Sequence, residues 1–273
     1  MNKVMKSARS YLFVPANRVE RFEKALNTDA DAVIIDLEDA VPVELKQSSR
    51  DALAAWLQNH PEHQVMIRVN SSQTEWFLAD IELAKFPNVS AIVLPKTESS
   101  AEIEAVLQIR EVGIFPLIET PLGLANVRQI ACAKQVIALM FGTIDFQLEM
   151  NMNGGYLELL SFRNEFVLAS KLAGIQAPID GVTVDFKDEA MIQLETQQAK
   201  NLGFAGKLCI HPHQVDIVNQ IFSPTTVEID WANRVLNVVK QANGQAVSLD
   251  GKMIDLPVIL RAERILQHID FNQ

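Results

Sequence analysis

The segments DAVIIDLED (31–39), VSAIVLPK (89–96) and GIFPLIET (113–120) decide the fold of this 273-residue chain. Each is a short, almost continuous apolar run, rich in Val, Ile and Leu, with a charged residue at or beside its end. Continuous rather than alternating apolar character is typical of parallel strands, because helices cover both faces of such a sheet. We therefore predict a parallel sheet whose strands are joined by helices.

Five further runs of the same kind are separated by stretches with helical periodicity. They are SYLFVP (10–15), QVMIRVN (64–70), VIALMFGTID (136–145), DGVTVDF (180–186) and KLCIHP (207–212). Eight strands that alternate with helices match a (β/α)8 barrel, the TIM barrel. An open doubly wound sheet more often has five or six strands, and a glycine-rich turn follows its first strand, where this chain has PANRVERF. We predict an α/β fold, with a catalytic barrel over residues 1–223 and a C-terminal helical extension or lid over 224–273.

Composition excludes several classes of partner. The 24 basic and 34 acidic residues give a net charge of −10, with the signs mixed along the chain, whereas nucleic acids and anionic membranes require concentrated positive charge. Charges interrupt every apolar run before it reaches the length of a membrane span, and the apolar stretch in MNKVMKSARSYLFVP is too short for a secretory signal. Cys132 and Cys209 form no CxxC pair. We expect a cytoplasmic protein with neither a nucleic-acid nor a membrane partner.

Charged groups gather where the predicted strands end. In a TIM barrel the reacting groups project from the carboxyl ends of the strands, and the opposite face serves stability. Polar residues are common wherever a strand leaves the core, and this could explain any single charged residue at a strand end. It explains poorly why acids and bases alternate around one ring. Six of the eight runs end this way, at Asp36, Glu38 and Asp39, at Arg68 and Asn70, and at Lys96, Glu119, Asp145 and His211.

Glu119 and Asp145 are separated by one βα unit, so we expect them at the ends of neighbouring strands, about 4.8 Å apart. Two carboxylates this close would keep one protonated unless a cation lay between them. An oxygen-only pair with open water positions suits Mg²⁺ or Mn²⁺. An acid/base pair without metal, or a salt bridge to Arg68, remains open on spacing alone.

Arg68 ends its predicted strand in the sequence IRVN. A guanidinium at the barrel mouth is a natural bidentate partner for a substrate carboxylate, although an ion pair with the acids at 36–39 is an alternative. Arg18, Arg21 and Lys24 share one face of the first predicted helix, where they could hold phosphates. A solvated basic face is the commoner meaning of such spacing.

Several segments in a fixed order resemble a known family. They are LFVPANRVERFEKA, DAVIIDLEDAV, RVN, VLPKTES, IETPLG, GTID and LGFAGKLCIHPHQ, followed by the tail DGKMIDLPVILRAERIL. Together they are similar to the citrate lyase β-subunit-like proteins of the HpcH/HpaI aldolase superfamily. The resemblance extends from about Arg9 to Leu266.

The resemblance implies a TIM barrel that binds Mg²⁺ and makes or breaks a carbon–carbon bond beside a CoA thioester, such as citryl-, malyl- or citramalyl-CoA. Motif by motif, it implies that Glu119 and Asp145 are the metal ligands and that Arg68 binds the substrate carboxylate. Glu38 and Asp39 of the LEDA motif would hydrogen-bond the waters on the metal. We count these two acids and Arg68 among the catalytic residues, and Glu119 among the substrate contacts.

The resemblance also gives the tail a role. In related lyases an acid of the tail closes over the barrel of a neighbouring subunit, and here that acid is Asp255, which would protonate the acetyl-CoA enolate. It implies a homo-oligomer, a trimer or hexamer, in which the extension packs on a neighbour. We also expect Arg18 and Lys96 to contact the substrate. In the sixth-strand motif, GxNDL in many relatives, this chain has GTIDF, so Ile144 replaces a polar residue.

The resemblance favours a stand-alone Mg²⁺-dependent lyase that cleaves the CoA thioester of a 3-hydroxy diacid to acetyl-CoA and a keto acid. Three alternatives remain: a β subunit active only within a citrate lyase complex, a malyl-CoA-type thioesterase, and a catalytically silent CoA-binding protein. The presence of Arg68, Glu119, Asp145 and Asp255 disfavours the last, because binding alone requires no pair of metal-binding carboxylates.

Overall fold

Eight parallel strands close into a barrel in a computed structural model that describes residues 8–241 and 247–270. Each strand pairs with the next in sequence, and β8 returns to β1, where Ser10 lies opposite Lys207. The predicted TIM barrel is confirmed. The strands are β1 (Ser10–Pro15), β2 (Ala32–Asp36), β3 (Val65–Arg68), β4 (Val89–Leu94), β5 (Gly113–Ile118), β6 (Met140–Phe141), β7 (Ile179–Asp180) and β8 (Gly206–Cys209).

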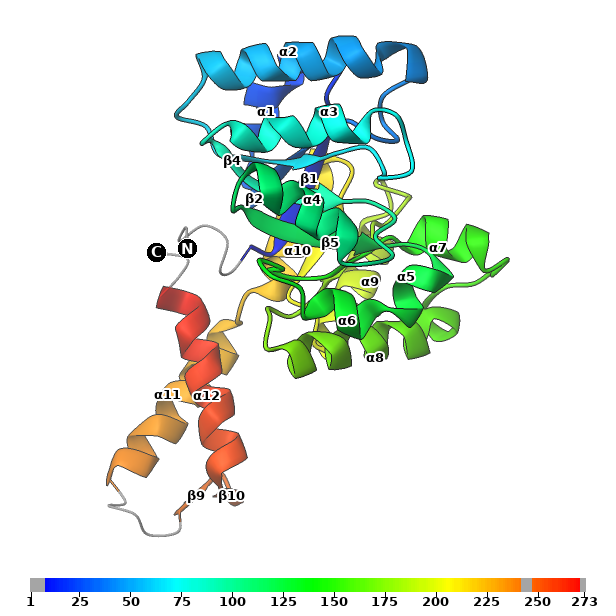
Figure 1. The fold of residues 1–273 in the computed structure, drawn as a ribbon. Coiled ribbons are helices and arrows are strands. Elements are labelled where there is room, and N and C mark those ends of the chain that lie inside the picture. Colours follow the sequence, from blue (N-terminus) through cyan, green and yellow to red (C-terminus); the bar gives the residue numbers. More distant parts are fainter. Residues whose placement is uncertain (1–7, 242–246, 271–273) are drawn as a thin grey trace. The chain divides into compact units, whose positions relative to one another are not determined.

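Helices connect the strands and lie outside the barrel (Figure 1). Among the local signals for them, Thr120 caps α5 by accepting a hydrogen bond from the Gly123 amide, and Gly174 ends α8 in the left-handed conformation that glycine tolerates. The helices are α1 (Phe22–Leu26), α2 (Lys46–Asn59), α3 (Phe77–Ile81), α4 (Ala101–Ile109), α5 (Pro121–Ala125), α6 (Val127–Ala131), α7 (Thr143–Glu149), α8 (Tyr156–Ala173), α9 (Glu189–Leu202) and α10 (Val215–Phe222).

The chain divides into two compact units, Met1–Phe222 with the barrel and Ser223–Gln273. The second unit consists of α11 (Thr226–Gln241), a hairpin of β9 (Val247–Leu249) and β10 (Lys252–Ile254), and α12 (Leu256–Asp270), with α11 and α12 packed side by side (Figure 1). Its own small core contains Ala232, Val235, Ile254 and Ala262. In the described part of the chain, no helix combines the length and apolarity that a membrane crossing requires.

Two apolar layers hold the barrel unit together. One fills the barrel itself and includes Tyr11, Met66 and Phe115, all nearly inaccessible to solvent. The other, larger layer lies between strands and helices. Because both faces of the strands are buried, the strand sequences are apolar almost throughout, which is the pattern that the sequence displays.

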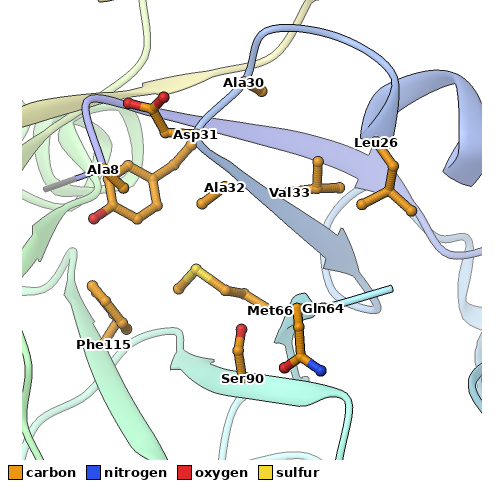
Figure 2. A pocket seen from close by; sticks show the side chains of 11 residues that line it. Ala8, Leu26, Ala30, Asp31, Ala32, Val33, Gln64, Met66, Ser90 and Phe115 are labelled. Carbon is orange, nitrogen blue, oxygen red and sulfur yellow. The ribbon is translucent and has the colours of Figure 1, made fainter. Parts of the chain in front are cut away.

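A cavity of about 80 Å³ lies at the amino-terminal end of the barrel, opposite the predicted mouth. Met66, Ser90 and Phe115 face it together with the start of β2 (Figure 2). Asp31, the carboxylate among its described lining residues, is already bound by Arg9 through two side-chain hydrogen bonds of 2.7 and 2.8 Å. This end of the barrel therefore has the apolar, ion-paired character of a stabilising face.

Two predicted strands differ from the structure. The sixth was expected over 136–145, but β6 comprises only Met140–Phe141, and α7 begins at Thr143. The seventh was expected over 180–186, but β7 ends at Asp180 and the chain then leaves the sheet. Ile144 and Val184, apolar residues beyond the two strand ends, are 47% and 62% exposed, so both predictions were too long at their carboxyl ends because apolar letters there indicated neither burial nor pairing. The sixth was also too long at its amino end, because β6 begins at Met140.

Candidate active site

A cavity of about 400 Å³ opens at the carboxyl-terminal ends of the strands, where the sequence predicts the chemistry. Four of the predicted site residues line it: Asp39, Arg68, Glu119 and Asp145. They come from the ends of β2, β3 and β5 and from the start of α7, so the barrel topology brings together residues far apart in sequence. Apolar side chains from β1, β6 and β8 and from the loop after β7 form the remaining wall.

Arg68 is held by acids on several sides. Its Nε and Nη2 donate to the two oxygens of Asp36 at 2.7 and 2.6 Å, and its Nη1 lies 3.1 Å from Glu38 Oε2 and 3.7 Å from Asp39 Oδ2. The Phe13 ring lies 4.7 Å from the guanidinium carbon. The ion pair with the acids at 36–39 is therefore present, and a substrate carboxylate would share Arg68 with them.

Asp36 organises the turn that carries the other two acids. Besides binding Arg68, its oxygens accept hydrogen bonds from the backbone amides of Glu38 at 2.9 Å and Ala40 at 3.1 Å. Burial alone would raise the pKa of Asp36, but the Arg68 charge and these hydrogen bonds hold that pKa below its usual value. An ionised Asp36 thus fixes both Arg68 and the LEDA turn.

Lys96 connects two of the acids. Its Nζ donates to Glu38 Oε1 at 3.0 Å, and its backbone amide donates to Glu119 Oε1 at 2.8 Å. Its φ of 48° is in the left-handed region, which costs energy for a residue other than glycine. Neither Lys96 nor Glu38 lines the cavity. Lys96 is connected to it through Glu119, and Glu38 through Arg68.

Glu119 is almost completely buried, with 1% of its surface exposed. Burial, together with the negative charge of Glu38, raises the pKa of Glu119 to about 8. The next residues, Thr120 and Pro121, begin α5 and fix the position of this carboxylate at the end of β5. On the other side, a Cβ at Gly142 would lie 2.5 Å from Glu119 Oε2, so only glycine leaves room for the carboxylate there.

Asp145 lies in the first turn of α7, and the expectation that it ends the sixth strand was wrong. It follows β6 by a tight connection through Gly142, and β6 pairs with β5, whose end carries Glu119. The two carboxylates therefore line the same cavity although only one of them directly follows a strand.

The site contains more acidic than basic side chains. Five acids (Asp36, Glu38, Asp39, Glu119 and Asp145) and three bases (Arg68, Lys96 and Lys46, whose Nζ donates to the Leu37 and Glu38 carbonyls) sum to 3 − 5 = −2 when all are ionised. Within residues 8–241 and 247–270, no three His, Cys, Asp or Glu side chains are placed to share one metal ion. Mg²⁺ commonly binds one or two carboxylates and completes its shell with water and substrate oxygens. Glu119 and Asp145, which both line the cavity, form a donor set that fits such an ion.

Arg18 and Asp255 are the two remaining predicted site residues. Arg18 lies in the loop after β1, outside the lining of the cavity, with 55% of its side chain exposed and its Nη1 3.9 Å from Glu20 Oε1. Asp255 belongs to the second unit, where it is exposed and its Oδ1 accepts a hydrogen bond from the Val258 amide at the start of α12. The roles expected for both residues stay predictions.

The sequence analysis missed one ionic cluster beside the site. Arg163 binds buried Asp180 through hydrogen bonds of 2.9 and 3.3 Å, and Lys207 Nζ lies 3.6 Å from Asp180 and 3.7 Å from Glu195. Each of these residues lies in a different element, so no local spacing could have indicated the cluster. A lysine inside the apolar run KLCIHP was its one sequence signal.

Fold and site together define a (β/α)8-barrel protein with a carboxylate-rich pocket at the mouth of the barrel. The sequence model of the HpcH/HpaI aldolase/citrate lyase family matches residues 9–212. This chain belongs to that family, as its motifs predict, and the family's citrate lyase β subunits and aldolases are lyases.

Three full-length relatives illustrate the range of the family. A (3S)-malyl-CoA thioesterase of Cereibacter sphaeroides is 34% identical over 94% of this chain and 93% of its own length. The citrate lyase β subunit of Haemophilus influenzae is 34% identical over 96% of this chain and 97% of its own. The structure of CitE from Mycobacterium tuberculosis with magnesium, acetoacetate and coenzyme A aligns at a TM-score of 0.84, with 29% identity over 97% of this chain and 99% of that one.

Proposed function

We propose that this protein is a Mg²⁺-dependent carbon–carbon lyase that cleaves the CoA thioester of a 3-hydroxy diacid to acetyl-CoA and a 2-oxo acid. The observation that carries the proposal is the single cavity that brings together Arg68, Glu119 and Asp145 at the mouth of a barrel of this family. The magnesium and coenzyme A in the related CitE structure support the assignment of cofactor and substrate class.

Glu119 and Asp145 would hold the ion, whose Lewis acidity lowers the pKa of the substrate hydroxyl and stabilises the 2-oxo acid. Arg68 would bind the terminal carboxylate through Nη1, which the carboxylate would share with Glu38 and Asp39. Glu38 and Asp39 would accept hydrogen bonds from water beside the ion. Lys96 would keep Glu119 in place through its backbone amide.

In the cleavage step the hydroxyl gives its proton to a water molecule beside Asp39 and becomes the carbonyl of the 2-oxo acid. The bond between the carbinol carbon and the α-carbon of the thioester breaks, and its electron pair forms the acetyl-CoA enolate. A proton added at that carbon completes the reaction, and we assign it to Asp255 on the C-terminal unit. Exclusion of water by that unit would protect the enolate and the thioester.

A mass-spectrometric assay with malyl-, citramalyl- and citryl-CoA in Mg²⁺ tests the proposal. Acetyl-CoA together with a 2-oxo acid supports a lyase. Free CoA together with an intact hydroxy diacid identifies a thioesterase, the second candidate, which the Cereibacter relative favours. Turnover only after addition of an acyl-carrier subunit would identify a citrate lyase β subunit, which is the name of the Haemophilus relative.

Matched variants connect the assay to the site. Glu119→Gln should lose most of the activity because it removes one charged metal ligand. Glu165→Gln, on α8, should retain it because Glu165 lies outside the lining of the cavity and pairs with the exposed Arg128. Full activity of the wild type in EDTA would overturn the metal assignment.

A further inference from the structure

A second cavity, of about 460 Å³, adjoins the first and shares Thr143, Ile144 and Val182 with it. It exists because the chain leaves the sheet after Asp180 instead of continuing as a strand. The segment after β7, together with α8 and α9, forms its remaining walls. Ile144, which lines both cavities, directly precedes Asp145. A substituent on a substrate carbon held beside the Asp145 carboxylate could therefore enter the second cavity.

Apolar side chains gather around this second cavity. Ile144, Val184, Met191 and Leu194 all line it, and between 41% and 62% of the surface of each is exposed. Large apolar side chains exposed together around a concave site mark a place where an apolar group binds. Tyr156 adds an aromatic side chain to the same lining.

The charges of the second cavity disfavour an anionic guest. Among its described lining residues Arg163 is the one cation, and it is engaged by Asp180 in a bidentate pair. Nearby Lys207 is 2% exposed and donates to the Gly181 carbonyl at 2.7 Å. Asp185 and Glu195 line the cavity as acids. A carboxylate would meet two like charges there, and the cation of the described lining is already paired.

We infer that the second cavity binds the substituent on the hydroxyl-bearing carbon of the substrate, and that this substituent is an uncharged alkyl group. The inference rests on the proposed function and narrows it. The 2-oxo acid that is released, or taken up in the reverse condensation, carries an alkyl chain in preference to hydrogen or a carboxyalkyl group. The preferred substrates are alkyl-branched 3-hydroxy diacid thioesters.

Titration calorimetry of the full-length protein in Mg²⁺ tests this with pyruvate, 2-oxobutanoate, 2-oxopentanoate and 2-oxoglutarate. The last two have the same number of carbons, so they differ only in a terminal methyl or carboxylate. Each added methylene should tighten binding about three- to fourfold, and 2-oxopentanoate should bind on the order of tenfold more tightly than pyruvate. 2-Oxoglutarate should bind more weakly than 2-oxopentanoate by a similar factor.

Val184→Asp should reduce the ratio of 2-oxopentanoate to pyruvate affinity, because Val184 lines only the second of the two cavities. Leu172→Asp is the matched control, because Leu172 is 65% exposed on α8 and lies outside both linings. It should keep the wild-type ratio. Circular dichroism checks that both variants are folded.

Binding that does not change or weakens with chain length, or a preference for 2-oxoglutarate, would overturn the inference and leave the lyase proposal standing. An unchanged ratio in folded Val184→Asp would also overturn it. If none of the four acids binds, and none condenses with acetyl-CoA by mass spectrometry, the proposed function itself fails, and the inference fails with it.

Discussion

Asp36 and Arg68, the last residues of the neighbouring strands β2 and β3, lie opposite each other in register and join their side chains by two hydrogen bonds of 2.7 and 2.6 Å. Asp36 is 1% exposed, so the pair is shielded from solvent. The pairing of β2 with β3 therefore sets the orientation of the Arg68 guanidinium at the barrel mouth.

Asp36→Asn should lower the free energy of unfolding by about 3 kcal/mol, because it leaves the buried Arg68 charge without its main partner. Arg128→Gln breaks an ion pair of similar geometry, but on an exposed surface, and should cost much less because water screens it. Denaturant unfolding of both variants measures the contrast. Equal losses would mean that the Asp36–Arg68 pair contributes no more than a surface contact.

Gly142→Ala should weaken Mg²⁺ binding at least tenfold, because the new Cβ would lie 2.5 Å from Glu119 Oε2 and displace that carboxylate. Gly206→Ala is the matched control, since its Cβ would crowd the Arg9 carbonyl at 2.6 Å, at the opposite end of the barrel. Both variants are expected to lose stability. Only Gly142→Ala should lose affinity in a calorimetric Mg²⁺ titration. Equal affinities of the two variants would mean that Glu119 is not a metal ligand.

The pKa of about 8 for Glu119 predicts a pH dependence of stability in EDTA. The unfolded chain releases this proton near pH 4.5, whereas the folded protein retains it to about pH 8. Between these values the folded state binds more protons, so the free energy of unfolding should fall as pH rises. Denaturant unfolding at pH 6 and pH 8 measures this decrease in the free energy of unfolding, which should be smaller in Glu119→Gln than in the wild type. The same decrease in both proteins would assign the effect to other groups.

The two cysteines should differ sharply in reactivity. Cys132 is exposed, whereas Cys209 is buried in β8, and that burial raises the pKa of Cys209 to about 12. The thiolate is the reactive form, so at pH 8 a thiol reagent should modify one cysteine per folded chain and two after denaturation. Cys132→Ser should abolish the fast reaction. Rapid modification of Cys209 in the folded protein would contradict its burial.

The sequence predicted the fold well because continuous apolar runs and their number reflect the doubly covered strands of a barrel. The prediction was less accurate for residues that are buried but do not belong to a strand. Val136 lies within the predicted sixth strand and is buried, but it only forms an isolated bridge to Ile114 ahead of β6. A run of apolar letters cannot distinguish such a residue from a strand residue.

For the site, strand ends were a good guide to which residues meet and a poor guide to how. The predicted strand ends placed Arg68, Glu119 and Asp145 at one mouth, and all three line its cavity, although Asp145 lies in α7 rather than at a strand end. They could not reveal the left-handed backbone of Lys96, whose amide donates to Glu119 beyond the end of the neighbouring strand. Side-chain geometry across strands has no signature in local sequence.

The final prediction concerns Asp255, which caps α12 in a unit that folds around its own core. If this acid completes the site of another subunit, Asp255→Ala and Glu119→Gln proteins should each be nearly inactive alone. Co-refolded, they should regain about a quarter of the wild-type activity, since random mixing pairs an intact barrel with an intact tail at about one site in four. Co-refolded Asp255→Ala and Asp145→Asn proteins should recover equally. Mixed oligomers, verified by mass, that stay inactive would place the tail over its own barrel.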